Sequence, residues 1–420
     1  MPRSPRHIVV AGLLAAVLVF PATVAAKSST VIRFATFNAS LNRNAAGQAR
    51  EDLSSPGNAQ ADAVAEIIQR IRPDVLLINE FDYYPNNQLV NAFQKNYLGR
   101  AHNGAPAINY RFSFVAPSNT GITSGFDLNN NGFYDDTPGD QAYGDDSFGF
   151  GEFEGKFGMA VYSRYPIDYA AIRTFQHFLW RDMPGALLPD DASTEAPMDW
   201  YSPAELNVFR LSSKSHWDVP IRIGHETVHF LVSHPTPPVF DAAEDRNGKR
   251  NNDEIRFWAD YITPGATSAY IYDDAGNWGG LGAGEKFVIA GDQNSDPLDG
   301  DSVEGSIQQL LDHPLVNTSF TPSSAGGPYW ADVQDALNDG HQSDPLYDTA
   351  DFCDTPAFPP CSGPGNLRAD YVLPRVTLPI VDGAVFWPTA SDPLVYLTGT
   401  GFPAPSSDHR AVWIDVAIPK

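Results

Sequence analysis

Near the C-terminus, the polar stretch Ser406-Ser407-Asp408-His409-Arg410 leads directly into the apolar stretch Ala411-Val412-Trp413-Ile414-Asp415-Val416. The apolar stretch is short and rich in β-branched residues, which predicts a strand. An acid and a histidine at the mouth of a strand place a metal ligand beside a proton-transfer or phosphate-binding group. On its own, this pair of residues is weak evidence for a functional site.

Three other predicted strands end in similar polar side chains: Phe37-Asn38, Asn79-Glu80 and Gly291-Asp292-Gln293-Asn294-Ser295. The glycine of the last stretch permits a tight exit from its strand and a close approach of a ligand to the backbone. An ordinary Asx turn would explain that stretch if it stood alone. Four separate strands that each carry Asp, Asn, Glu or His at one tip instead predict an active site.

The remaining chain is organised as short apolar stretches separated by long polar ones. Strands are predicted at residues 31–38, 75–78, 157–162, 228–233, 286–290, 370–373 and 411–418, and one helix at 61–71, ended by Pro73. Polar inserts rich in Gly, Asp, Asn, Pro and Ser lie near residues 119–155, 181–203 and 296–365. Because the polar tips spread from Asn38 to His409, we expect a single catalytic domain over residues 27–420 with large surface loops.

The N-terminus has the three parts of a secretory signal peptide, predicted over residues 1–26. Arg3 and Arg6 give a positive start, an apolar run covers residues 8–20, and small residues precede a cleavage site near Ala26. The apolar run is too short to span a bilayer comfortably. We therefore expect a secreted protein, extracellular or periplasmic, without stable membrane insertion and by default monomeric.

The amino-acid composition limits the kinds of partner that the chain can bind. The formal net charge is −24 over 420 residues, and such a surface repels polyanions unless cations intervene. The basic stripe that usually grips duplex DNA is not visible in the sequence. The two cysteines, Cys353 and Cys361, are predicted to form one loop-closing disulfide in an oxidising compartment.

As an ordered set beside strands, these motifs resemble the endonuclease/exonuclease/phosphatase superfamily, which has the deoxyribonuclease-I-like fold. The matching positions are Asn38, Glu80, the segment Gly158-Met159-Ala160-Val161-Tyr162-Ser163-Arg164, His234, Gly291-Asp292-Gln293-Asn294-Ser295, Asp370-Tyr371 and Ser407-Asp408-His409. The resemblance covers nearly all of the chain after residue 26. It implies an α/β (α+β) fold, a four-layer α/β/β/α sandwich with two mostly antiparallel sheets, and metal-dependent phosphoester hydrolysis.

The resemblance also implies a metal site. Glu80 would be the principal ligand, and Asn38 and Asp408 would complete the site. Oxygen ligands favour Mg²⁺, Mn²⁺ or Ca²⁺ over Zn²⁺, and we expect Mg²⁺ or Mn²⁺. A hard cation neutralises the negative charge of the phosphoester and polarises its bridging bond.

By the same resemblance, five residues would carry the chemistry. Asp292 would orient or activate the attacking water, and Asn294 would bind phosphate or metal. His234 and His409 would hold the phosphoryl oxygens and assist proton transfer. Asp370 would hydrogen-bond the His409 ring and fix its tautomer.

A competing motif, His225-Glu226-Thr227-Val228-His229, matches the zinc-protease pattern H-E-x-x-H. That chemistry requires a helix, which brings the two histidines onto one face. The flanking residues alternate and are β-branched, which favours a hairpin or consecutive strands. In an extended strand the two histidines would be roughly 13 Å apart, too far to share one zinc ion.

A second cation site is suggested within the first polar insert. Asp127, Asn129, Asn131 and Asp135 supply oxygen side chains around a turn-forming glycine, as in a calcium loop. Pro138 stands where such a loop usually has glutamate. A structural Ca²⁺ site and a solvated, Asx-rich loop both remain open interpretations.

The sequence therefore predicts a secreted, divalent-metal-dependent phosphoester hydrolase that uses in-line attack of an activated water. Its substrate would be a phosphoester, which could be a nucleic acid, a nucleotide, a sugar phosphate or a lipid. Two alternatives stay open at this point. One is an extracellular DNA or RNA endonuclease specifically, and the other is a non-catalytic, calcium-stabilised surface binding protein.

Overall fold

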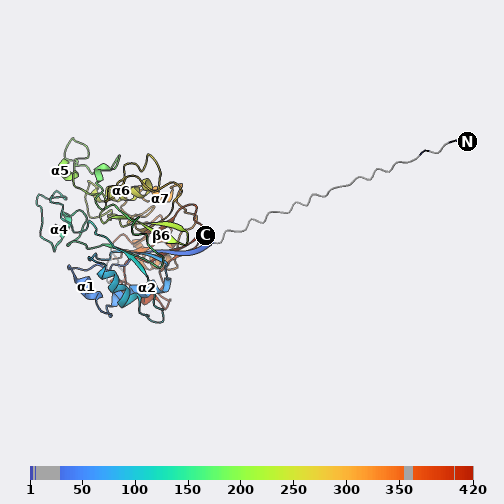
Figure 1. Cartoon of the computed structure of the whole chain (residues 1–420). Helices are drawn as coiled ribbons and strands as arrows, with labels where there is room; N and C mark the ends of the chain where they lie inside the picture. Colours follow the sequence, from blue (N-terminus) through green and yellow to red (C-terminus); the bar gives the residue numbers. More distant parts are fainter. Residues whose placement is uncertain (3–4, 6–28, 354–362, 402, 420) are drawn as a thin grey trace.

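A computed structural model describes residues 1, 2, 5, 29–353, 363–401 and 403–419. Most of the predicted signal peptide, and Cys361 of the predicted disulfide, lie outside these residues, so both stay predictions. Two β-sheets lie at the centre, with α1 and α2 on one outer side and α6 and α7 on the opposite side (Figure 1). Within the described residues, no helix combines the length and the apolar character needed to cross a lipid bilayer.

The first sheet has six strands in the order β12-β13-β1-β2-β4-β3. Its central pair, β1 and β2, is parallel, and the other pairs are antiparallel. The strands are β1 (Ser29–Asn38), β2 (Val75–Asn79), β3 (Phe112–Phe114), β4 (Met159–Ser163), β12 (Ile380–Val385) and β13 (Val412–Pro419). The C-terminal strand β13 thus lies beside the first strand β1, with Ser29 paired in register with Pro419.

The second sheet has five strands in the order β11-β8-β7-β6-β5, with β7 and β8 parallel and the rest antiparallel. These strands are β5 (Arg173–Thr174), β6 (His216–Ile223), β7 (Glu226–Ser233), β8 (Lys286–Asp292) and β11 (Asp370–Pro374). A two-stranded ribbon is formed by β9 (Ala350–Asp351) and β10 (Asn366–Leu367).

Helices cover the outer faces of the sheets or lie in the inserts. The α-helices are α1 (Gln48–Leu53), α2 (Ala59–Ile71), α3 (Gln88–Phe93), α4 (Gln141–Asp145), α5 (Pro203–Leu206), α6 (Arg246–Tyr261), α7 (Gln308–Leu311) and α8 (Gly326–Gln334). A π-helical turn, η1 (Gln94–Leu98), follows α3, and the 3₁₀ turns are η2 (Trp180–Asp182), η3 (Asp335–Leu337), η4 (Pro345–Tyr347) and η5 (Val395–Leu397). The predicted helix α2 is capped by the Asn58 side chain, which accepts from the backbone N–H of Ala61.

Three apolar cores separate the four layers. One joins the inner faces of the two sheets, where Phe34 of β1 packs against Phe230 of β7 with ring centroids 5.7 Å apart. A second core lies between the first sheet and helices α1, α2 and α3, and a third lies between the second sheet and α6. The predicted four-layer sandwich with two mostly antiparallel sheets is confirmed.

Two local predictions can be compared with the structure. The strand predicted from residue 157 begins only at Met159, because Phe157 has a left-handed backbone (φ 56°) and donates its N–H to Asp82. The H-E-x-x-H stretch begins at His225, in the turn between β6 and β7, and continues along β7, so it is not helical. His229 lies on β7 and contacts Asp218 at 2.8 Å, so the helix that a zinc protease needs is absent from this stretch.

Candidate active site

The polar tips of strands from both sheets meet at one edge of the sandwich. In the first sheet Asn38 is paired in register with Asn79, and in the second sheet Asp292 is paired with Asp370. The two sheets are joined at this edge because the backbone N–H of Asp292 donates to Asn79 Oδ1 at 3.2 Å. The strand register therefore decides which side chains share the site.

Asn38 connects two of the predicted acidic residues. Its Nδ2 donates to Glu80 Oε1 at 3.1 Å and to Asp292 Oδ2 at 3.0 Å. The other oxygen of Glu80 accepts from Asn42 Nδ2 at 2.8 Å. Burial, and then the neighbouring charge of Asp408, raise the pKa of Glu80.

Asp408 reaches the same edge from the segment before β13. Its Oδ1 accepts from Ser40 Oγ at 3.1 Å, and Ser407 Oγ donates to the backbone oxygen of Asn38 at 2.7 Å. Asp408 is thus fixed beside the tip of β1. The three predicted metal ligands lie together at this tip.

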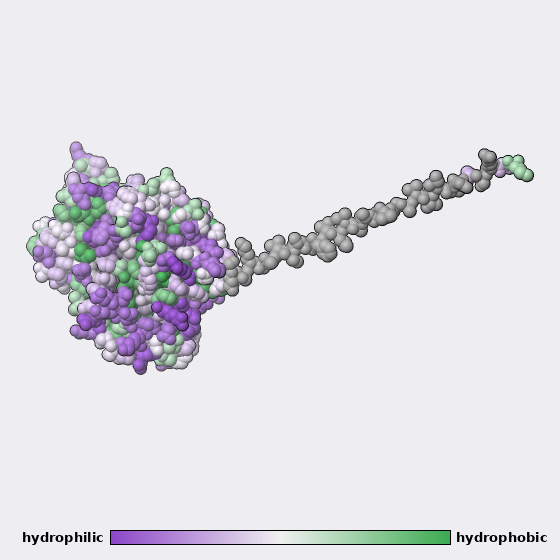
Figure 2. All heavy atoms as spheres, in the orientation of Figure 1, coloured by the Kyte–Doolittle hydropathy of each residue, from purple (hydrophilic) through white to green (hydrophobic). Residues whose placement is uncertain are grey.

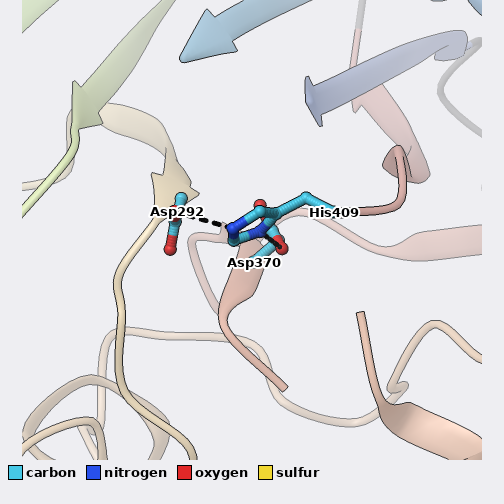
Figure 3. Close-up of side chains that lie close together, drawn as sticks. All are labelled: Asp292, Asp370 and His409. Atoms are coloured by element: carbon cyan, nitrogen blue, oxygen red, sulfur yellow. Dashed lines mark hydrogen bonds and ion pairs between the residues drawn. The ribbon is translucent and has the colours of Figure 1, made fainter. Parts of the chain in front are cut away.

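His409 stands between two buried carboxylates, as Figure 3 shows. Its Nδ1 lies 2.8 Å from Asp370 Oδ2, and its Nε2 lies 3.5 Å from Asp292 Oδ2. Burial alone would lower the pKa of His409, but the charges of Asp370 and Asp292 raise it well above the usual range. Burial raises the pKa of Asp370 to about 6, against the opposing effect of His409. The pair therefore favours a proton on the imidazole and a negative charge on Asp370.

His234 approaches Asp292 from the other side, and its pKa is shifted in the opposite direction to that of His409. Its Nε2 lies 3.4 Å from Asp292 Oδ2. Burial, and then the charge of Lys214, lower the pKa of His234 to about 4, so this imidazole is neutral at pH 7. Burial would raise the pKa of Asp292, but His409 and His234 together lower it below its usual range. One carboxylate thus faces one charged and one neutral imidazole.

Asn294 follows Asp292 in a tight turn. Its backbone N–H donates to Asp292 Oδ1 at 2.9 Å, and its Nδ2 donates to the backbone oxygen of Pro235 at 3.1 Å. The turn requires a left-handed backbone at Asn294 (φ 50°), which asparagine tolerates better than most residues. All eight predicted catalytic and metal residues are therefore brought together.

The donor set fits a hard divalent cation. Glu80, Asp292 and Asp408 place three carboxylates close enough for Asp408 and Asp292 to raise the pKa of Glu80. Asp292 is buried, Glu80 and Asp408 are half-buried, and like charges this close are costly unless a cation lies among them. Among the described residues, an overlapping group of Asp292, Asp370 and His409 has ligand atoms all within 4.8 Å of one another. Oxygen donors dominate both sets, which suits Mg²⁺ or Mn²⁺.

The suggested calcium loop forms a series of Asx turns. Asp127 accepts from the backbone N–H groups of Asn131 and Gly132, at 3.1 and 2.7 Å. Asn129 and Asn131 accept in the same way from residues two positions later. Asp135 accepts from the N–H of Thr137 at 2.8 Å. Both interpretations of this loop are compatible with these contacts, and Ca²⁺ binding stays a prediction.

Several residues that hold the site together were not predicted from the sequence. Asn42 and Ser40 follow Asn38 closely, so their position after a strand tip was a usable signal. Thr349 donates from its hydroxyl to Asp370 Oδ2 at 2.9 Å and accepts from the N–H of Asp370. Thr349 comes from the long insert at 296–365, where no strand pattern pointed to a role.

Comparison with known proteins agrees with this arrangement. The sequence model of the Endonuclease/Exonuclease/phosphatase family matches residues 35–409. A search of curated proteins by sequence finds no match.

Similar solved structures include an endonuclease/exonuclease/phosphatase from Beutenbergia cavernae (14% identity, 93% of this chain and 72% of that chain, TM-score 0.47). They also include an endonuclease/exonuclease/phosphatase family protein from Bacteroides thetaiotaomicron (12% identity, 94% and 100%, TM-score 0.46) and sphingomyelinase C from Streptomyces griseocarneus (14% identity, 92% and 99%, TM-score 0.43). With the family match spanning all the strand tips described above, the chain belongs to the Endonuclease/Exonuclease/phosphatase family and is a hydrolase of that family.

Proposed function

We propose that this chain is a secreted, divalent-metal-dependent phosphoester hydrolase, a phosphodiesterase or phosphatase. The observation that carries the proposal is the contact of Asn38 with both Glu80 and Asp292, which joins a metal-ligand set to a catalytic carboxylate. Secretion rests on the signal-peptide pattern of residues 1–26.

Glu80, Asn38 and Asp408 would hold Mg²⁺ or Mn²⁺. When bound, this cation neutralises phosphoester charge and polarises the bridging bond. Asn42 and Ser40 keep Glu80 and Asp408 in place through hydrogen bonds of 2.8 and 3.1 Å. Fixed ligands of this kind spare the site the reorganisation that a flexible set would need.

Asp292 is the group that receives a proton from the attacking water. It stays ionised at neutral pH because its pKa is lowered by His409 and His234, and ionised carboxylates accept hydrogen bonds only. His409, with its raised pKa, is the positively charged donor toward the phosphoryl oxygens, and Asp370 keeps its Nδ1 proton in place. His234 and Asn294 contribute neutral N–H donors on the other side of Asp292. This placement supports in-line attack of water on phosphorus.

The charge of the chain favours small phosphoesters, sugar-linked or lipid-linked, over nucleic acid. The formal charge is −24, and hydrophilic residues alternate with smaller hydrophobic areas on the face drawn in Figure 2. An extracellular nuclease is the second candidate, and it is favoured only by the family to which the chain belongs.

The first test is hydrolysis of bis-p-nitrophenyl phosphate by the purified mature chain with Mg²⁺ or Mn²⁺. We expect release of p-nitrophenolate that EDTA abolishes. Glu80→Gln keeps the shape of the ligand but removes its charge, and His409→Ala removes the cationic donor. Each should lower kcat by about 10²-fold or more.

Matched controls use the same substitutions away from the site. Glu285→Gln and His177→Ala change half-exposed or exposed side chains of the second sheet and its loops. Both should keep wild-type rates. Full activity in folded Glu80→Gln or His409→Ala protein would refute the assignment of the site. A wild-type chain that is inactive on phosphodiesters, phosphomonoesters, nucleic acids and phospholipids would favour the non-catalytic alternative.

A further inference from the structure

Lys214 lies buried beside the proposed site, close enough to His234 to lower its pKa. Its side chain is 5% exposed, and its Nζ contacts the backbone oxygen of Pro235 at 3.5 Å. The same oxygen accepts from Asn294 Nδ2 at 3.1 Å. The ammonium and the Asn294 amide therefore converge on one carbonyl group, directly after His234 in the sequence.

The ammonium group of Lys214 has N–H donors that its contact with Pro235 does not use. A lysine ammonium has three N–H donors, and the contact with Pro235 is long for a hydrogen bond. Within the described part of the chain, no carboxylate lies within ion-pair distance of Lys214. Glu254, Glu80 and Asp292 are nevertheless near enough that their charges oppose the lowering of the Lys214 pKa by burial. A buried cation that faces the site without a direct ion pair is suited to bind an anion.

The segment that carries Lys214 is held by buried polar side chains. Asn119 donates through Nδ2 to the backbone oxygen of Ser212 at 2.7 Å and through its N–H to that of Lys214 at 2.8 Å. Arg250, fully packed beneath the segment, donates to the backbone oxygen of Leu211 at 2.8 Å. A Cβ at Gly149 would lie 1.9 Å from the Ser213 oxygen, so this position admits only glycine. The backbone of Lys214 is thereby fixed.

Glu254 couples this segment to the one that carries His234. Its two carboxylate oxygens accept from the N–H groups of Ser213 and Thr236, each at 2.6 Å. Burying a carboxylate and an arginine is costly unless their hydrogen bonds are satisfied. The hydrogen bonds of Glu254 to Ser213 and Thr236 satisfy its carboxylate, and they hold the segments of Lys214 and His234 in a fixed relation.

We infer that Lys214 is a phosphate-binding residue, whose ammonium donates to a non-bridging oxygen of the phosphoryl group next to Asn294. This inference rests on the proposed function, because it names a further contact within the same site. It also places an amino group where a negatively charged substrate must approach the carboxylates of Glu80 and Asp292.

The test measures binding of inorganic phosphate to the mature protein by calorimetry, first in EDTA and then with Mg²⁺. Lys214→Met should raise the Kd for phosphate by about tenfold or more in both conditions, because a charge-assisted hydrogen bond is lost. Lys214→Arg should raise the Kd less, because it keeps the charge. Lys286→Met is the matched control, since Lys286 begins β8 and pairs with Glu226 at 2.7 Å, at the opposite end from Asp292. It should bind phosphate as the wild type does.

The outcomes separate this inference from the proposed function. If wild-type protein hydrolyses bis-p-nitrophenyl phosphate and folded Lys214→Met keeps the wild-type Kd for phosphate, the role of Lys214 is refuted while the hydrolase survives. If the wild type binds phosphate through Lys214 but hydrolyses no phosphoester, the proposed function fails instead. Should Lys214→Met not fold, as judged by circular dichroism, Lys214→Gln replaces it and decides by the same comparison of Kd.

Discussion

At the scale of single residues, Asp292 is the side chain on which the site converges. Its carboxylate accepts from Asn38 Nδ2 and from the N–H of Asn294, and it faces His234 and His409 at 3.4 and 3.5 Å. The two imidazoles around it differ in charge because burial and Lys214 lower the pKa of His234, whereas His409 has a second carboxylate, Asp370, within hydrogen-bond distance. Environment, and not residue type, therefore assigns different roles to the two histidines.

A second buried carboxylate, Asp348, predicts a pH-dependent stability. It is 2% exposed, its Oδ1 has no hydrogen-bond partner among the described residues, and burial raises its pKa to about 8, with Asp296 contributing. Because the folded pKa exceeds the unfolded value, the folded state keeps a proton that the unfolded state has lost. The contribution of Asp348 to the free energy of unfolding is therefore fully present below pH 4, and it is lost as the pH rises toward 8.

Asp348→Asn should remove the loss of stability that the ionisation of Asp348 causes between pH 4 and pH 8. We expect the free energy of unfolding to rise by roughly 2–5 kcal/mol at pH 8 and to change little at pH 4. Urea unfolding at the two pH values measures the difference. Asp332 is exposed and lines one surface pocket together with Asp348, so Asp332→Asn provides the control, for which we expect no comparable difference between the two pH values. An equal change at both pH values would show that the effect is not one of ionisation.

At the scale of elements, the end of β8 depends on a glycine. A Cβ at Gly291 would lie 2.1 Å from the backbone oxygen of Ser233 at the end of the neighbouring strand β7. Gly291→Ala should therefore push β7 and β8 apart, lower stability by about 2–4 kcal/mol and lower kcat by roughly tenfold through displacement of Asp292. Gly340→Ala is the control, because its Cβ would meet nothing within 4 Å and its backbone is not in the left-handed region. Similar losses in both variants would contradict a steric cause.

The helix α6 shows where local sequence gives little guidance. Its first half, Arg246-Asn247-Gly248-Lys249-Arg250-Asn251-Asn252-Asp253, contains glycine and three asparagines, which are poor helix formers, and the sequence analysis predicted no helix there. Packing of Phe257 and Trp258 against the second sheet stabilises it. Glu254 and Arg250 lie on the buried face of this helix, and their side chains hydrogen-bond to the backbone of the segment that carries Lys214. Tertiary contacts override propensity here because the helix is almost entirely buried.

At the scale of the whole molecule, the charge of −24 predicts an unusual salt dependence. If the chain cleaves plasmid DNA at all, its kcat/KM should rise as NaCl increases from about 10 to 150 mM, because salt screens the mutual repulsion. Hydrolysis of bis-p-nitrophenyl phosphate should change less, since this substrate carries a single charge. A kcat/KM for DNA that falls with salt would indicate a basic binding groove and favour the nuclease alternative.

The sequence by itself predicted seven strands and the order of their polar tips, because periodicity and strand ends are local properties of the chain, and the resemblance carried by those tips implied the fold. The tertiary structure alone decided which tips touch, as Asn38 and Asp292 do across 254 residues. It also decided the opposite charge states of His234 and His409, and the places of Thr349 and Lys214. These depend on burial and on contacts between distant segments, which no local pattern records.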